Sequence, residues 1–225
     1  MAGIEHSKKH STRRRISVLI SVVAVFFLLF LLVVLRDQYF QKQISFPYVA
    51  EERDIQVMSL IQFDGPNIDE DGYMGENIAG LQVKNISDTY ISEADIELVM
   101  ENGASYHFMI QDLPKEAVTT ALEKSSRTYD KREICTDIKT SVKTEDISMK
   151  EDAVDIKTDG TEITVANISQ NPTGDMTVIY RYLAGDSYIG GRSYKITVPP
   201  LEPGESYKYE DTTGVMGLPY VVGVQ

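Results

Sequence analysis

The chain has 225 residues, enough for one large domain or two small ones, and ordinary proportions of hydrophobic (42%) and charged (25%) residues. Its net charge is −12, and residues 1–36 carry +5, so residues 37–225 carry −17 (−12 − 5). A surface that acidic repels phosphate backbones, which excludes nucleic-acid binding by the main part of the chain.

An uninterrupted apolar segment, residues 16–35, follows a basic tail of residues 1–15. At about 1.5 Å per residue, a helix over this segment spans the roughly 30 Å hydrocarbon core of a bilayer. Arg13, Arg14 and Arg15 precede the segment and an acidic chain follows it. The positive-inside rule therefore keeps the tail cytoplasmic and places the remainder outside the cytoplasm. We predict a single-pass transmembrane signal anchor in the cell membrane.

Two alternatives to an anchor fit this segment less well. A cleavable signal peptide has a shorter apolar region that ends in a small-x-small site, whereas this segment ends at Leu35-Arg36-Asp37. A buried core helix of a soluble protein has a polar face, and residues 16–35 have none.

The remainder of the chain reads as strands. Residues 36–53 are predicted to form a polar, partly aromatic stalk. From Ile55 onwards, short alternating apolar runs are separated by turn-forming groups such as Asp159-Gly160 and Pro203-Gly204. Many short strands at this spacing predict an all-β fold built from β-sandwich modules.

An internal repeat divides this part of the chain. Three stretches match in the same order: Leu81–Ser87 with Ile163–Ser169, Ile96–Met100 with Val178–Tyr182, and Leu113–Glu116 with Leu201–Glu205. A duplicated unit is the simplest explanation. We therefore predict two tandem immunoglobulin-like β-sandwich modules, residues 54–150 and 151–225, after the one transmembrane helix.

The sharpest candidate site is the run Asn67-Ile-Asp69-Glu-Asp71-Gly72. Calcium loops place oxygen ligands at alternate positions and a glycine at the sixth. Asn67, Asp69 and Asp71 fit the first, third and fifth positions, but the twelfth is Ile78 rather than glutamate. A calcium loop is therefore one hypothesis, and a solvated acidic loop between two strands is the preferred one.

Other residues with chemical potential have simpler structural interpretations. His107 lies alone in a strand-like run, and Cys135 reads as a small strand residue, with an intermolecular disulfide as the alternative. Asn85 and Asn167 begin glycosylation sequons at equivalent repeat positions, which favours a shared turn. Core packing is likewise favoured over carbohydrate stacking for the tyrosines Tyr180, Tyr182, Tyr188 and Tyr194. We predict that the protein is not an enzyme.

The second repeat resembles the FxLYD-type β-sandwich modules of bacterial surface proteins. The resemblance rests on Val165–Ser169, Val178–Tyr182, Gly190–Tyr194, Leu201–Ser206 and Tyr220–Val224. It covers residues 155–225 well and residues 55–150 more loosely. The literal five-letter motif is absent, and Pro114-Lys115 stands where the second copy has a Pro-Gly turn. The anchor and two modules are together similar to uncharacterised membrane-anchored proteins of clostridial, Gram-positive bacteria.

This resemblance implies a non-enzymatic module of the cell envelope with no cofactor and no known ligand. We accordingly expect an extracytoplasmic interaction or envelope-assembly protein with a protein or other envelope partner. The alternative is a cell-surface ligand-binding or sensing protein that uses glycan or calcium contacts. Fold analogy alone does not decide between them.

Overall fold

The computed structural model describes residues 21–36, 43–69, 74–125, 127–145, 152–213 and 217–225. The chain divides into two compact units, Met1–Gln43 and Ile44–Gln225, which are described separately below.

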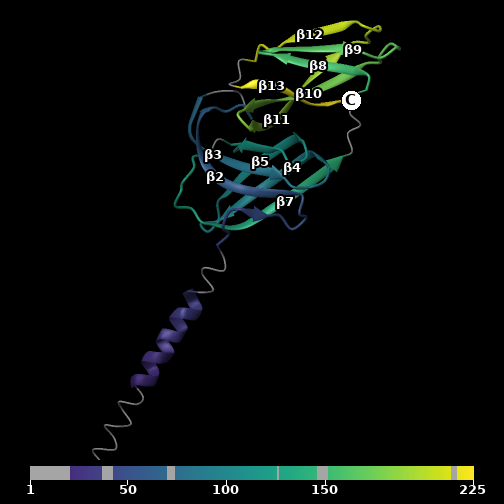
Figure 1. Cartoon of the computed structure of the whole chain (residues 1–225). Coiled ribbons are helices and arrows are strands. Elements are labelled where there is room, and N and C mark those ends of the chain that lie inside the picture. The colour runs from purple at the N-terminus through teal and green to yellow at the C-terminus, as the bar shows by residue number, and fades with distance from the viewer. Residues whose placement is uncertain (1–20, 37–42, 70–73, 126, 146–151, 214–216) are drawn as a thin grey trace, which may run out of the picture. The chain divides into compact units, whose positions relative to one another are not determined.

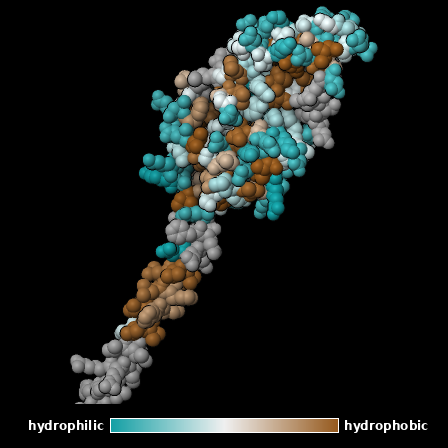
Figure 2. Space-filling model, viewed as in Figure 1, coloured by the Kyte–Doolittle hydropathy of each residue, from teal (hydrophilic) through white to brown (hydrophobic). Residues whose placement is uncertain are grey.

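The first unit contains a helix at residues 21–36. Its large apolar side chains are exposed, with Phe26 at 69% and Phe30 at 66%, and Figure 2 shows the helix as a hydrophobic surface. In the part of the chain that the structure describes, no helix combines the length and the apolarity needed to cross a membrane. The predicted anchor begins in residues 16–20, and these lie outside the described residues, as do residues 1–15 of the basic tail.

The second unit is built of strands, so the predicted all-β class is confirmed for it (Figure 1). A short strand, β1 (Tyr48–Val49), pairs with the first long strand. The first half then contains β2 (Ile55–Pro66), β3 (Met74–Asn85), β4 (Tyr90–Met100), β5 (Ser105–Leu113), β6 (Val118–Leu122) and β7 (Cys135–Glu145). They pair antiparallel in the orders β2-β3-β6 and β5-β4-β7.

The second half repeats this pattern of pairing. It contains β8 (Val154–Asp159), β9 (Glu162–Asn167), β10 (Met176–Ala184), β11 (Ser187–Val198), β12 (Ser206–Glu210) and β13 (Leu218–Val224). These strands pair antiparallel as β8-β9-β12 and β11-β10-β13. Taken in chain order, strands β8 to β13 of the second half thus pair with one another as strands β2 to β7 of the first half do.

The two halves are joined edge to edge. Strand β6 of the first half pairs in parallel with β11 of the second, at Thr119↔Tyr188 and Thr120↔Ile189. One seven-stranded sheet results, in the order β1-β2-β3-β6-β11-β10-β13. The joint fixes the halves by backbone pairing, which a flexible linker between tandem modules does not do.

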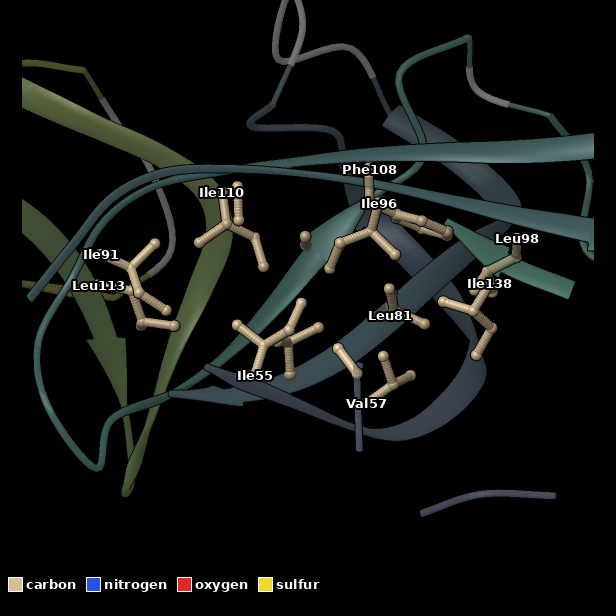
Figure 3. Close-up of a cluster of buried hydrophobic side chains, with 14 of the residues drawn as sticks. Ile55, Val57, Leu81, Ile91, Ile96, Leu98, Phe108, Ile110, Leu113 and Ile138 are labelled. Atoms are coloured by element: carbon tan, nitrogen blue, oxygen red, sulfur yellow. The ribbon is translucent and has the colours of Figure 1, made fainter. Parts of the chain in front are cut away.

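Two hydrophobic clusters fill the unit, and the larger one crosses the joint. Figure 3 shows part of it: Ile91, Ile96, Leu98, Phe108, Ile110 and Leu113 of β4 and β5 lie across from Ile55, Val57 and Leu81 of β2 and β3. The same cluster includes Ile179, Tyr188 and Val222 from the second half. The smaller cluster lies between β8-β9-β12 and the opposite face of β10, β11 and β13. Burial at about 25 cal/mol per Å² therefore stabilises the joint as well as each half.

The folded unit begins earlier than the predicted first module. Ile44, Phe46 and Tyr48, which fall in the predicted stalk, pack against the larger cluster. At the other predicted boundary, near residue 150, strand β7 ends at Glu145 and β8 begins at Val154, and residues 146–151 between them lie outside the described residues.

The shared asparagine turn predicted from the repeat is confirmed. The Asn85 amide donates to the carbonyls of Thr89 and Leu113, and its oxygen accepts from the Ser87 N–H at 2.9 Å. Asn167 makes the same set of bonds, to Asn171 and Leu201 and from the Ser169 N–H at 2.9 Å. Both asparagines are buried, so neither amide is presented for glycosylation.

Candidate functional site at the joint between the halves

Asp69, a predicted calcium ligand, lies at the joint between the halves. The loop after β2 turns through Asn67, whose side-chain oxygen accepts a hydrogen bond from the Asp69 N–H at 3.1 Å. Asn67 is fully buried, and Asp69 is 7% exposed. The preferred hypothesis of a solvated loop is therefore wrong for these two residues, because both are buried.

The Asp69 carboxylate accepts three backbone N–H bonds from two strands. The donors are Leu122 at the end of β6 (2.7 Å), Gly191 in β11 (2.7 Å) and Arg192 in β11 (3.0 Å). Burial raises the pKa of Asp69, while these three N–H groups and the nearby Arg181 act in the opposite direction. One carboxylate thus satisfies donors from both halves at the point where β6 meets β11.

This geometry bears directly on the calcium hypothesis. The Asp69 oxygens point at backbone N–H donors inside the protein, and Asp71 lies outside the described residues. Within the described residues, no group of three or more His, Cys, Asp or Glu side chains is placed to hold a metal ion. The calcium loop of Asn67, Asp69 and Asp71 remains a prediction, and Asp69 has a structural role in addition.

Arg181 of β10 is the second charged side chain of the joint, and it is fully buried. Its guanidinium donates to the carbonyls of Gln111 (2.5 Å) and Gly190 (2.6 Å) and to the Thr119 hydroxyl (2.8 Å). It also lies 5.3 Å from the centre of the Tyr188 ring, within cation–π range. Burial lowers its pKa to about 10, so the side chain is still protonated at neutral pH.

Sequence reasoning did not identify Arg181 as a functional or structural residue. The available signal was an arginine within the otherwise apolar run Val178-Ile-Tyr-Arg-Tyr182. A charged residue in a strand that is buried on both faces needs internal partners, because an unpaired buried charge is costly. Here two of those partners, Gln111 and Thr119, belong to the first half.

A pair of glycines lets the two halves approach this closely. Gly190 has a positive φ of 75°, and a Cβ there would collide with Ile68 and with the Asp69 carboxylate. A Cβ at Gly191 would overlap the backbone oxygen of Met109 in β5. The Gly190-Gly191 pair is therefore required for backbone packing at the joint.

Beside this polar cluster lies an apolar groove of about 450 Å³, here called the joint groove. The first half contributes Ile61, Phe63, Ile68 and Met74 to its lining, and the second half contributes Tyr188 and Ile189. Its volume falls within the range typical of small-molecule sites, and such sites favour interfaces between domains.

Asp64 is the one charged residue among the described residues that line the joint groove, and it is exposed. Its two oxygens accept hydrogen bonds from the Asn77 N–H (2.5 Å) and from the Gln62 amide (3.0 Å). These bonds hold the carboxylate in place at the groove. Ser187 and Thr120 add hydroxyl groups to the lining.

The tyrosines for which carbohydrate stacking was an alternative are mostly inside the protein. Tyr180 and Tyr182 are 2% and 0% exposed, and the centres of their rings lie 5.8 Å apart in a T-shaped contact. The centre of the Tyr194 ring lies 5.4 Å from that of Tyr180 and 5.0 Å from that of Tyr182. The preferred core-packing interpretation is confirmed for Tyr180 and Tyr182, whose ring faces are covered by protein.

The remaining sequence candidates lie apart from the joint. His107 of β5 is exposed, opposite Glu97 of β4. Cys135 is 6% exposed, its thiol donates to the Asp137 carbonyl, and burial raises its pKa. A buried thiol with a raised pKa is unreactive, which disfavours the intermolecular disulfide.

Comparison with known proteins assigns no family. No protein-family model matches the chain, and no curated protein matches it.

Proposed function

We propose that the chain is a single-pass membrane protein whose unit Ile44–Gln225 lies outside the cytoplasm and serves, without catalysis, in interactions or assembly at the cell envelope. The tail of residues 1–15 is cytoplasmic and residues 16–35 are the anchor in this proposal. The two halves of the folded unit are tandem immunoglobulin-like β-sandwich modules of FxLYD type.

The anchor is supported by the chemistry of the helix at residues 21–36. The side chains of residues 22–35 are apolar, and most are exposed, including Phe27 at 64% and Leu32 at 60%. Contact of such a surface with water costs about 25 cal/mol per Å², whereas lipid tails solvate it. The three arginines that precede residues 16–35 orient the helix by the positive-inside rule.

The joint between the halves is the observation that carries the interaction proposal. Removing Asp69 and Arg181 from water costs several kcal/mol per ion before their hydrogen bonds are counted. Both side chains bond across the joint, so the halves are held in one fixed arrangement. A fixed arrangement presents the surfaces of both halves to a partner in one constant geometry. Less conformational entropy is then lost when the partner binds.

The second candidate function, a cell-surface ligand-binding or sensing protein, is favoured by the joint groove. The groove is concave, largely apolar and built from both halves, as ligand sites often are. Glycan contacts through the faces of Tyr180 and Tyr182 are not part of this proposal, because both residues are buried.

A topology experiment tests the membrane proposal. The full chain with a C-terminal tag is expected to resist alkaline extraction from membranes, and protease added outside intact cells should remove the tag. Moving Arg13, Arg14 and Arg15 to the C-terminal side of residue 35 should protect the tag, while replacing them by lysine in place should change nothing. A chain released by alkaline extraction, or a tag whose accessibility ignores the arginines, would overturn the proposal.

A crosslinking experiment tests the interaction proposal. Photo-crosslinking residues at Val49 and Ile168, which are 44% and 57% exposed and lie one in each half, are introduced into the full chain in intact cells. We expect a discrete crosslinked envelope protein, with a yield that falls in an Asp69→Ala background but not in the surface control Asp88→Asn. Crosslinks that are absent, or that are unaffected by Asp69→Ala, contradict a role for the fixed joint.

A further inference from the structure

The joint groove has a lining that selects for charge as well as for apolar character. Ile61, Phe63, Ile68, Met74 and Ile189 supply apolar side chains from both halves. Asp64 is the one charged residue among the described residues of the lining, and no lysine or arginine is among them. The Asp64 side chain is exposed at the groove, and its negative charge attracts a cation and repels an anion there.

Two further observations sharpen this selectivity. Hydrogen bonds from Asn77 and Gln62 already hold the Asp64 carboxylate, so its side chain loses little conformational entropy when a ligand binds. Residues 37–225 carry a charge of −17, which attracts cations and repels anions at longer range (−12 − 5). The Asp64 carboxylate and the net charge of residues 37–225 therefore both favour a cationic ligand.

We propose that the joint groove binds a small apolar ligand with a cationic end, such as an aryl-alkyl amine, with its apolar body between the halves and its ammonium at Asp64. The apolar body is covered by Phe63, Ile68 and Ile189, and the ammonium donates to the carboxylate oxygens. The groove lies wholly within Ile44–Gln225, so this proposal does not rest on the membrane anchor.

The test uses three probes with one apolar body and different ends: 4-phenylbutylamine, 4-phenylbutanol and 4-phenylbutyrate. Binding to the full chain in phosphatidylcholine nanodiscs is measured by titration calorimetry, with empty nanodiscs as the blank. We expect the amine to bind with a Kd of about 1 mM or tighter, as fits a ligand of this size. Because Asp64 is exposed, pairing with its carboxylate should make the affinity of the amine roughly two- to fivefold higher than that of the alcohol. The carboxylate should bind more weakly than either.

Two variants locate the site. Asp64→Asn keeps an oxygen for one of its two donors and should abolish the preference for the amine, while leaving the alcohol affinity unchanged as a check that the fold is intact. Ala184→Trp places a large side chain in the groove and should abolish binding of all three probes. Ser206→Trp, at an exposed position in β12, is the matched control and should bind as the wild type does.

The outcomes separate cleanly. Loss of selectivity in Asp64→Asn together with loss of binding in Ala184→Trp supports the proposal. Equal affinity for amine and carboxylate, wild-type binding by Ala184→Trp, or binding of none of the probes overturns it. Because the topology experiment reads a different part of the chain, failure here leaves the membrane proposal standing.

Discussion

Replacement of Asp69 tests the central claim about the joint, that one buried carboxylate bonds the two halves together. Asp69→Ala leaves the N–H groups of Leu122, Gly191 and Arg192 buried without their acceptor. Each such loss costs about 1–3 kcal/mol, and the relieved desolvation of the carboxylate offsets part of the sum. We expect a net loss of about 3–5 kcal/mol in the free energy of unfolding.

Asp69→Asn is expected to cost less than Asp69→Ala. The amide keeps one acceptor oxygen but turns an N–H₂ group toward backbone donors, so one or two of the three bonds are lost at about 1–3 kcal/mol. The surface control Asp88→Asn removes a pair with Lys115 in which the Asp88 side chain is 97% exposed, and it should change stability by less than about 0.5 kcal/mol.

Thermal unfolding of the full chain measures these differences. Near-UV circular dichroism of the tyrosines reports tertiary packing, since the chain has 13 tyrosines and no tryptophan. For a unit of this size, each kcal/mol shifts Tm by roughly 2–4 °C, so Asp69→Ala should lower Tm by roughly 6–20 °C. Equal Tm values for Asp69→Ala and Asp88→Asn would refute the role assigned to the carboxylate.

Three further outcomes are expected. Gly191→Ala should prevent stable folding or lower Tm at least as much as Asp69→Ala, because its Cβ overlaps the Met109 backbone oxygen; a soluble variant with wild-type Tm would contradict this packing. Hydrogen bonds donated by Arg132 lower the pKa of Asp130 to about 2. This carboxylate therefore stabilises the folded state above pH 3.8, its ordinary pKa, and the stabilisation is lost as pH falls through about 2. Wild type should therefore gain stability relative to Asp130→Asn as pH rises from 2 to 4, measured by unfolding at each pH, and parallel profiles would count against the pair. Millimolar calcium should raise Tm only if the loop hypothesis for Asn67, Asp69 and Asp71 holds, and an unchanged Tm retires that hypothesis.

Local patterns explain why much of the fold was predictable. Strand positions follow from alternating apolar residues, as in Ile96, Leu98 and Met100 of β4, which are all buried. The turns at Asn85 and Asn167 were predictable because each asparagine bonds to backbone two and four residues away. The core position of Tyr180 and Tyr182 follows from the same alternation.

The joint was not predictable in the same way, because its contacts join residues far apart in the chain. Asp69 meets Gly191 across 122 positions, and Arg181 meets Gln111 across 70. In the sequence, Asp69 is one acid among several in a polar run, and its local surroundings favour a solvated loop. Its burial depends on a strand edge that a later part of the chain supplies.

The amino-acid sequence by itself determined the all-β class of the folded unit, most of its strands and the repeated asparagine turns, because side-chain alternation and short-range hydrogen bonds act within a few residues. Strands β7 and β8 were not predicted. Only the tertiary structure decided that β6 and β11 join the halves in one sheet, that Asp69 and Arg181 are the buried charges of that joint, and that a groove opens beside it. Parallel pairing of two strand edges leaves no local pattern, since each edge offers the same backbone groups whatever its partner.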